Sequence, residues 1–142
     1  GPVAACGTFY VQALEVKEIV FYAGLGPGLL ATSLLVVNNL RDEPTDRKAG
    51  KLTLAVRFGT AFARTEYLAL ITSAVMLPVF LALWLNGKWY ACISALIIIP
   101  GYSAIRQIIS GVRGKELNQT LSVSGKLIII YSTLFSIGWL IG

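Results

Sequence analysis

Four long apolar blocks dominate this chain of 142 residues and constrain what it can fold into. Hydrophobic residues make up 56% of the sequence and charged residues only 13%, whereas soluble domains carry about 25% charged residues. A helix needs about 20 predominantly apolar residues to cross a bilayer, and the blocks reach or approach that length. They run over Ile19–Leu40, Tyr67–Leu85, Trp89–Ile105 and Leu127–Ile141. We therefore expect a polytopic membrane protein.

The blocks predict helices, because none of them shows the alternation of apolar and polar residues that is typical of a membrane-spanning strand. Residues Gly1–Leu14 are also apolar and predict a further helix that the start of the chain cuts short. The last block becomes longer if Ser122–Gly125 joins it and Lys126 extends to the interface. The expected fold is an all-α membrane protein, a multi-helix transmembrane bundle with about four to five helices.

The basic residues predict the orientation of this bundle. Six Lys and Arg residues lie between Leu40 and Tyr67 and four between Ile105 and Leu127, whereas the opposite side has only Lys17 and Lys88. Since cytoplasmic loops are enriched in Lys and Arg, we expect both long loops in the cytoplasm. The net charge of +5 is thus explained by membrane topology, and nucleic acid is not an expected partner.

Prolines and one short link predict how the helices bend and connect. Pro78 and Pro100 lie inside apolar blocks and are expected to kink them, since proline removes a helical hydrogen bond. Asn86-Gly87-Lys88 is a three-residue link between two blocks. A link of this length makes the helices on either side antiparallel neighbours.

An acidic motif comes directly after the first long block. Asn38, Asp42 and Asp46 recur every four residues, which places an amide and two carboxylates on one broad face of a helix. Unpaired acids at the membrane edge are costly unless a cation or substrate neutralises them. Because Pro44 lies within the motif, we expect the helix to end or bend near Asp42, with Asp46 in the first turn of the next segment. Both acids are still expected to converge on one ion.

The ion that these acids predict is Mg²⁺, which prefers oxygen ligands and usually binds through one or two carboxylates and the phosphates of a substrate. The chain has no histidine, which excludes imidazole sites, and Cys6 and Cys92 are expected to be packing residues in helices. The cations beside the motif, including Arg41 and Lys51, can contact phosphate oxygens. The alternative is a solvated loop whose charges balance each other.

Two further segments carry candidate polar contacts. Residues 48–59 are basic and amphipathic, but they lack the leading glycine and the hydroxyl residue of a nucleotide-binding loop. This segment either lies at the membrane interface or uses Lys51 and Arg57 to neutralise a diphosphate. Asn118, in the second basic loop, is a candidate hydrogen-bonding residue near the same site.

The stretch Val37-Asn-Asn-Leu-Arg-Asp-Glu-Pro-Thr-Asp46, together with Lys48–Gly59, resembles the second aspartate-rich region of the membrane aromatic prenyltransferases, the UbiA-type superfamily. It is most similar to the branch that prenylates 1,4-dihydroxy-2-naphthoate in menaquinone biosynthesis, and Gly7–Gln12 and Gly114–Asn118 also resemble that branch. The resemblance implies a bundle of roughly nine transmembrane helices with a cytoplasm-facing cavity. Two aspartate-rich motifs there hold Mg²⁺ and the diphosphate of the donor.

The resemblance also implies roles for individual residues. Asp42 and Asp46 are the implied catalytic and metal-binding carboxylates. The implied substrate-binding or site-lining residues are Asn38, Asn39, Arg41, Lys51 and Arg57. Since only the second acidic motif is present, we expect residues 1–142 to be the C-terminal part of a single transmembrane prenyltransferase domain. On this interpretation the N-terminal helices and the first motif are absent, and the chain alone is inactive.

The implied activity is Mg²⁺-dependent transfer of a polyprenyl group from a polyprenyl diphosphate to 1,4-dihydroxy-2-naphthoate, with decarboxylation, giving demethylmenaquinone. The expected location is a bacterial plasma (inner) membrane, with the active site facing the cytoplasm. Two alternatives stay open. One is a prenyltransferase for another aromatic acceptor, such as 4-hydroxybenzoate or homogentisate. The other is a non-catalytic helical membrane subunit whose acids bind ions or balance nearby cations.

Overall fold

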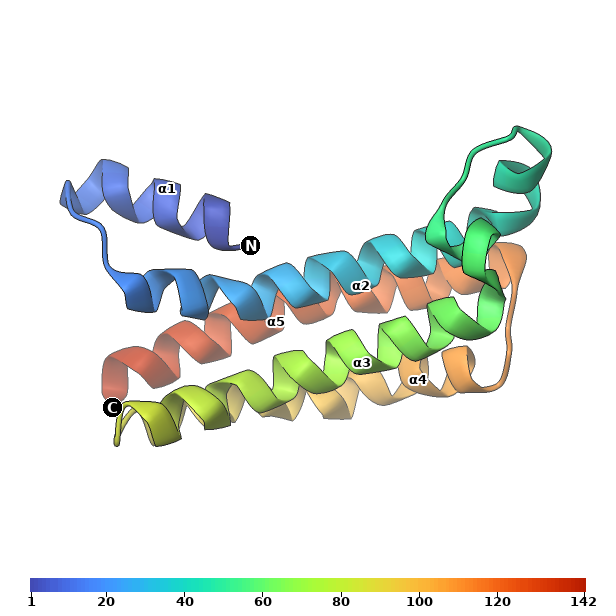
Figure 1. The fold of residues 1–142 in the computed structure, drawn as a ribbon. Coiled ribbons are helices and arrows are strands. Elements are labelled where there is room, and N and C mark those ends of the chain that lie inside the picture. Colours follow the sequence, from blue (N-terminus) through green and yellow to red (C-terminus); the bar gives the residue numbers. More distant parts are fainter.

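The computed structural model describes all 142 residues and consists of helices and their connections (Figure 1). The α-helices are α1 (Pro2–Ala13), α2 (Glu18–Lys48), α3 (Leu54–Trp84), α4 (Ile98–Ile109) and α5 (Leu117–Ile141), and the 3₁₀ helices are η1 (Trp89–Ile97) and η2 (Gly114–Glu116). Four helical segments are long and apolar enough to cross a membrane: α2, α3, η1 with α4, and η2 with α5. The prediction of an all-α membrane bundle is confirmed.

The long helices lie side by side, and α1 packs on the outside of α2 (Figure 1). α2 packs against both α3 and α5, and η1 packs against the same two helices from the other side. The link Asn86–Lys88 reverses the chain between α3 and η1, as predicted. Both long connections, α2–α3 and α4–α5, lie at one end of the bundle (Figure 1). The basic loops therefore share one end, as their sequence predicted.

The bundle interior is mostly aliphatic, with a few polar contacts between helices. Tyr67 of α3 and Tyr131 of α5 are fully buried, and the Tyr67 hydroxyl lies 3.2 Å from the Ser124 hydroxyl. Gly26 of α2 makes room for Tyr131, because a β-carbon there would collide with the tyrosine hydroxyl. Large apolar side chains also cover the outside: Ile129, for example, is 69% exposed. Such an exterior is what a lipid environment stabilises.

Pro44 does not end α2, so of the two predicted outcomes near Asp42, a helix end or a bend, the helix end is wrong. The helix continues through Pro44 and contains both Asp42 and Asp46. Proline removes the hydrogen bond to the carbonyl four residues earlier, but a side-chain contact reinforces the same turn. The Thr45 hydroxyl donates to the Asp42 carbonyl at 2.8 Å. One continuous helix therefore fixes the relative orientation of the two acids.

The helices are longer than the apolar blocks of the sequence, because they continue into the polar residues on either side. α3 begins at Leu54, where the Thr53 hydroxyl accepts a hydrogen bond from the Val56 N–H at 3.3 Å and caps the helix. The irregular backbone inside α3 lies at Gly59, with φ 88° and ψ 167°. Pro100 lies in the first turn of α4, where a missing N–H costs little. The change from 3₁₀ to α geometry comes just before it.

Candidate functional site

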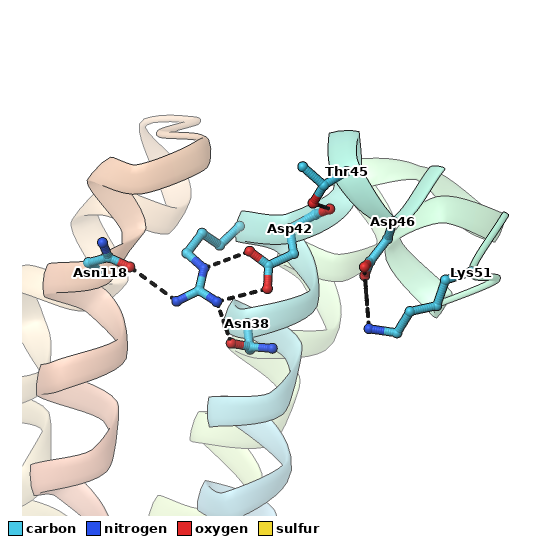
Figure 2. A network of polar contacts seen from close by, with 7 residues as sticks. Asn38, Asp42, Thr45, Asp46, Lys51 and Asn118 are labelled. Carbon is cyan, nitrogen blue, oxygen red and sulfur yellow. Dashed lines mark hydrogen bonds and ion pairs between the residues drawn. The ribbon is translucent and has the colours of Figure 1, made fainter. Parts of the chain in front are cut away.

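The candidate site lies where the apolar part of α2 gives way to polar residues, beside the start of α5 (Figure 2). Leu40 on α2 and Leu117 on α5 are 1% and 0% exposed and close the apolar interior at this level. The residues next to them, Arg41 and Asn118, are polar and partly or fully exposed. The polar cluster therefore lies at the end of the buried apolar core to which Leu40 and Leu117 belong.

Arg41 is the centre of this cluster. Its Nε donates to Asp42 Oδ1 at 2.7 Å and its Nη2 donates to Asp42 Oδ2 at 2.8 Å, a bidentate ion pair. Nη2 also donates to Asn38 Oδ1 at 2.9 Å, and Nη1 donates to Asn118 Oδ1 at 3.1 Å. One guanidinium thus joins three predicted site residues from two helices that are distant in sequence.

The ion pair determines the charge state of Asp42, which lies beyond the apolar part of α2. The hydrogen bonds from Arg41 lower the pKa of the Asp42 carboxyl, although partial burial acts in the opposite direction. The side chains of Arg41 and Asp42 are 28% and 32% exposed, so solvent and ligands can reach them. Asp42 is therefore an ionised, accessible carboxylate, which is the form that binds a metal.

Asp46 has a different neighbour. Figure 2 shows its side chain directed toward Lys51, and Lys51 Nζ lies 3.3 Å from both carboxylate oxygens. Gly50, at φ 71°, makes this possible. The N–H of Lys51 donates to the Asp46 carbonyl at 2.9 Å and the N–H of Gly50 donates to the Arg47 carbonyl at 3.3 Å, the pattern of a Schellman C-cap. This turn folds Lys51 back onto Asp46.

A cleft of about 430 Å³ opens beside Asp42, between the end of α2 and the α4–α5 connection. Pockets for small ligands typically have volumes of about 300–1,000 Å³. The cleft is lined by Arg41, Asp42, Pro44, Thr45, Gly114, Lys115 and Asn118. Both cations and the one acid face the same polar space, which suits an anionic ligand.

Five predicted residues are not part of the cleft lining: Asn38 and Asp46, described above, and Asn39, Lys51 and Arg57. Asn39 is half-buried next to the cluster and makes no side-chain hydrogen bond. Lys51 pairs with Asp46. Arg57 is exposed, and its guanidinium lies 5.4 Å from the centre of the Phe58 ring. Their roles as substrate contacts stay predictions.

The cleft also contains residues that the sequence did not single out. From the sequence, Lys115 was expected only to contribute to the membrane topology. No role in the site was expected for Thr45 or Gly114. One signal was present: Lys115 lies within Gly114–Asn118, a stretch that carries the family resemblance. Asn118 comes three residues later, a spacing that places side chains on one side of a helical segment.

The oxygen atoms beside the cleft are of the kind that coordinates a hard divalent cation. Asp42 supplies a carboxylate, and Asn38 and Asn118 supply amide oxygens. All three side chains accept hydrogen bonds from the Arg41 guanidinium. No group of three or more His, Cys, Asp or Glu side chains is close enough to hold a metal ion. Mg²⁺ does not need one, because it commonly uses one or two carboxylates and completes its shell with water and phosphate. Whether one ion takes both Asp42 and Asp46 stays a prediction.

A bundle of apolar helices long enough to cross a membrane, with a charged cleft at one end, is the architecture of an integral membrane protein. The family model described as the UbiA prenyltransferase family matches residues 1–138, and the chain belongs to this family. The predicted family is thereby confirmed. No solved structure matches the chain.

Individual relatives are more specific. The chain is 39% identical over 133 residues to the 1,4-dihydroxy-2-naphthoate octaprenyltransferase of Mycobacterium tuberculosis, which covers 93% of the chain and 44% of the relative. It is 31% identical over 138 residues to the Haemophilus influenzae protein of the same name, covering 96% and 44%. A UbiA prenyltransferase domain-containing protein of Dictyostelium discoideum is 27% identical over 141 residues, covering 99% and 41%. The chain thus spans less than half the length of these relatives.

Proposed function

We propose that the protein catalyses Mg²⁺-dependent transfer of a polyprenyl group from a polyprenyl diphosphate to 1,4-dihydroxy-2-naphthoate. The carbon–oxygen bond to the diphosphate breaks, a carbon–carbon bond forms at the ring, and the carboxylate leaves as carbon dioxide, giving demethylmenaquinol, the reduced form of demethylmenaquinone. The observation that carries the proposal is the cleft beside Asp42, which combines one carboxylate, two cations and one amide at the end of an apolar bundle. The names of the bacterial relatives support the naphthoate acceptor.

The residues of the cleft have complementary roles in this proposal. Asp42, together with Asp46, would hold Mg²⁺, which when bound supplies positive charge for the leaving diphosphate. Arg41 orients the Asp42 carboxylate through its bidentate contact and presents its guanidinium to phosphate oxygens. Asn38 and Asn118 hold Arg41 in place from two helices.

The apolar layer beneath the cleft would protect the reacting prenyl carbon. An allylic carbon that loses diphosphate reacts with water unless water is excluded. Leu40 and Leu117 are almost fully buried directly beside Arg41 and Asn118. The prenyl chain would extend from the polar cleft into the apolar environment of the bundle and bilayer. Substrate and product of this chemistry are both lipid-soluble, which suits such a location.

We also propose the arrangement of the protein in the membrane. Residues 1–142 belong to a single transmembrane prenyltransferase domain, since α2 contacts α1, α3 and α5. The end of the bundle that carries both basic loops faces the cytoplasm of a bacterium, because Lys and Arg are retained on that side of the plasma membrane.

The proposal is tested with the intact protein purified into lipid nanodiscs. Farnesyl diphosphate is supplied with 1,4-dihydroxy-2-naphthoate, 4-hydroxybenzoate or homogentisate, and prenylated products are measured by mass spectrometry. We expect the naphthoate to be prenylated with the highest kcat/KM, and EDTA to stop the reaction until Mg²⁺ is added. A product from another acceptor alone would change the assigned acceptor. No product from any acceptor, without Mg²⁺-dependent binding of farnesyl diphosphate, would favour a non-catalytic subunit.

A further inference from the structure

Lys115 is the cation of the cleft that has no partner within the protein. The other lining cation, Arg41, already binds the Asp42 carboxylate and two amides. Lys115 forms neither an ion pair nor a side-chain hydrogen bond, and its neighbour Glu116 forms none with it. Because Arg41 and Asp42 offset each other, the cleft carries one uncompensated positive charge, and that charge belongs to Lys115.

The backbone that carries Lys115 is fixed on both sides. On the N-terminal side of Lys115, Gly111 has φ 79° just after the end of α4. Arg64 of α3 donates a hydrogen bond to the Gly111 carbonyl at 3.1 Å. After it, the Leu117 side chain is fully buried. The η2 turn between these two anchors places Lys115 on the cleft, while its long side chain stays exposed to ligand and solvent. The fold thus determines where the Lys115 backbone lies relative to the cleft.

We propose that Lys115 binds the phosphate oxygens of the prenyl donor, from the side of the cleft opposite α2. This inference rests on the proposed function. An ammonium group is a compact point charge that contacts phosphate oxygens without the fixed geometry of a guanidinium. The phosphate does not have to compete with Asp42 for Lys115, whereas it does have to compete with Asp42 for Arg41. The acceptor carries one negative charge, on its carboxylate, whereas the diphosphate of the donor carries more. Lys115 therefore increases the binding affinity of the donor more than that of the acceptor.

The test compares Lys115→Gln and Lys115→Arg with the matched control Arg113→Gln. Arg113 is an exposed cation of the same connection that does not line the cleft. In the intact protein, KM for farnesyl diphosphate, KM for 1,4-dihydroxy-2-naphthoate and inhibition by inorganic pyrophosphate are measured. We expect Lys115→Gln to raise KM for farnesyl diphosphate and the inhibition constant of pyrophosphate by about tenfold, the size expected for a hydrogen bond to a charged group. Lys115→Arg should stay within about threefold of the parent.

Pyrophosphate inhibition separates a binding role from a merely structural one, because a disturbed connection would also change KM for the naphthoate and the thermal stability. Parental values for farnesyl diphosphate and pyrophosphate in Lys115→Gln would overturn the assignment of Lys115. An equal change in Arg113→Gln would overturn it as well, by showing a general effect of charge. The unmodified intact protein is measured in parallel: no prenyl transfer and no Mg²⁺-dependent binding of farnesyl diphosphate by it would overturn the proposed function itself, whatever the Lys115 variants show.

Discussion

Asn118 at the start of α5 accepts a hydrogen bond from Arg41 near the end of α2 at 3.1 Å, across 77 residues of sequence. Both residues line the cleft, and Figure 2 shows Asn118 on the helix that lies beside the one carrying Asn38 and Asp42. The same guanidinium binds Asp42, so Asn118 acts on the carboxylate through Arg41. The contact therefore determines how the two sides of the cleft are placed relative to each other.

Asn118→Ala should reduce catalysis more than stability. The side chain is exposed, so its loss leaves no buried polar group without a partner. Arg41 loses one charge-assisted hydrogen bond, for which we expect about a tenfold decrease in kcat/KM, because such a bond contributes roughly 1.5 kcal/mol or more. Steady-state kinetics in nanodiscs and thermal unfolding monitored by circular dichroism measure the two effects.

The matched control is Gln119→Ala, which removes a neighbouring amide that binds Gln107 and does not line the cleft. It should retain kcat/KM. Equal losses in both variants would mean that Asn118 acts only by stabilising the α4–α5 connection.

The fold could be predicted from the sequence where hydropathy alone determines it. The apolar blocks predicted the four long spans, and the unequal distribution of cations predicted that both long loops share one end. Helix ends were less predictable, because capping and side-chain bonds determine them. Pro44 lies inside α2, and α3 starts at the Thr53 cap before its apolar block begins.

The site could be predicted only in part. Asp42, Arg41 and Asn38 lie within one short motif, so helical spacing brought them together in the prediction. Lys115 comes from a distant connection, and no local pattern indicates that it lies across from Arg41. The separate partners of Asp42 and Asp46 were also not predicted, because Lys51 reaches Asp46 only through the turn at Gly50.

Asp42→Asn and Asp46→Asn should both abolish prenyl transfer, with little effect on folding. Each removes a carboxylate proposed to hold Mg²⁺, for which we expect a loss of at least about 10²-fold in kcat. Product formation at saturating farnesyl diphosphate and Mg²⁺ measures the effect. Glu43→Gln, in which the lost acid pairs with Arg47 away from the cleft, should retain most of the activity. Near-normal turnover in either aspartate variant would remove that residue from the metal site.

Arg41→Gln should raise the affinity for the metal ion and lower the affinity for the prenyl donor. In the free protein Arg41 occupies both oxygens of Asp42, so a divalent cation must compete with it. Its removal should raise the affinity for Mn²⁺ about threefold, because a partly exposed ion pair contributes roughly 0.2–1 kcal/mol. Binding of farnesyl diphosphate should weaken, because a phosphate contact is lost.

Electron paramagnetic resonance of bound Mn²⁺ and equilibrium binding of farnesyl diphosphate measure these two affinities. Arg47→Gln is the control, since Arg47 pairs with Glu43 outside the cleft. If Arg41→Gln lowered the affinity for both ligands, Arg41 would be supporting the Asp42 carboxylate and not competing for it.

Gly50→Ala should destabilise the end of α2 and loosen the contact between Lys51 and Asp46. Gly50 has φ 71° and open space around its α-carbon, so the cost comes from backbone strain and not from a collision. A residue with a β-carbon is less stable than glycine by about 1 kcal/mol in this conformation. Gly125→Ala, in the middle of α5 and also free of close neighbours, should be neutral or stabilising, because alanine favours helix. Thermal unfolding in one detergent compares the two variants, and a Gly50→Ala protein as stable as the parent would show that the turn is not under conformational constraint.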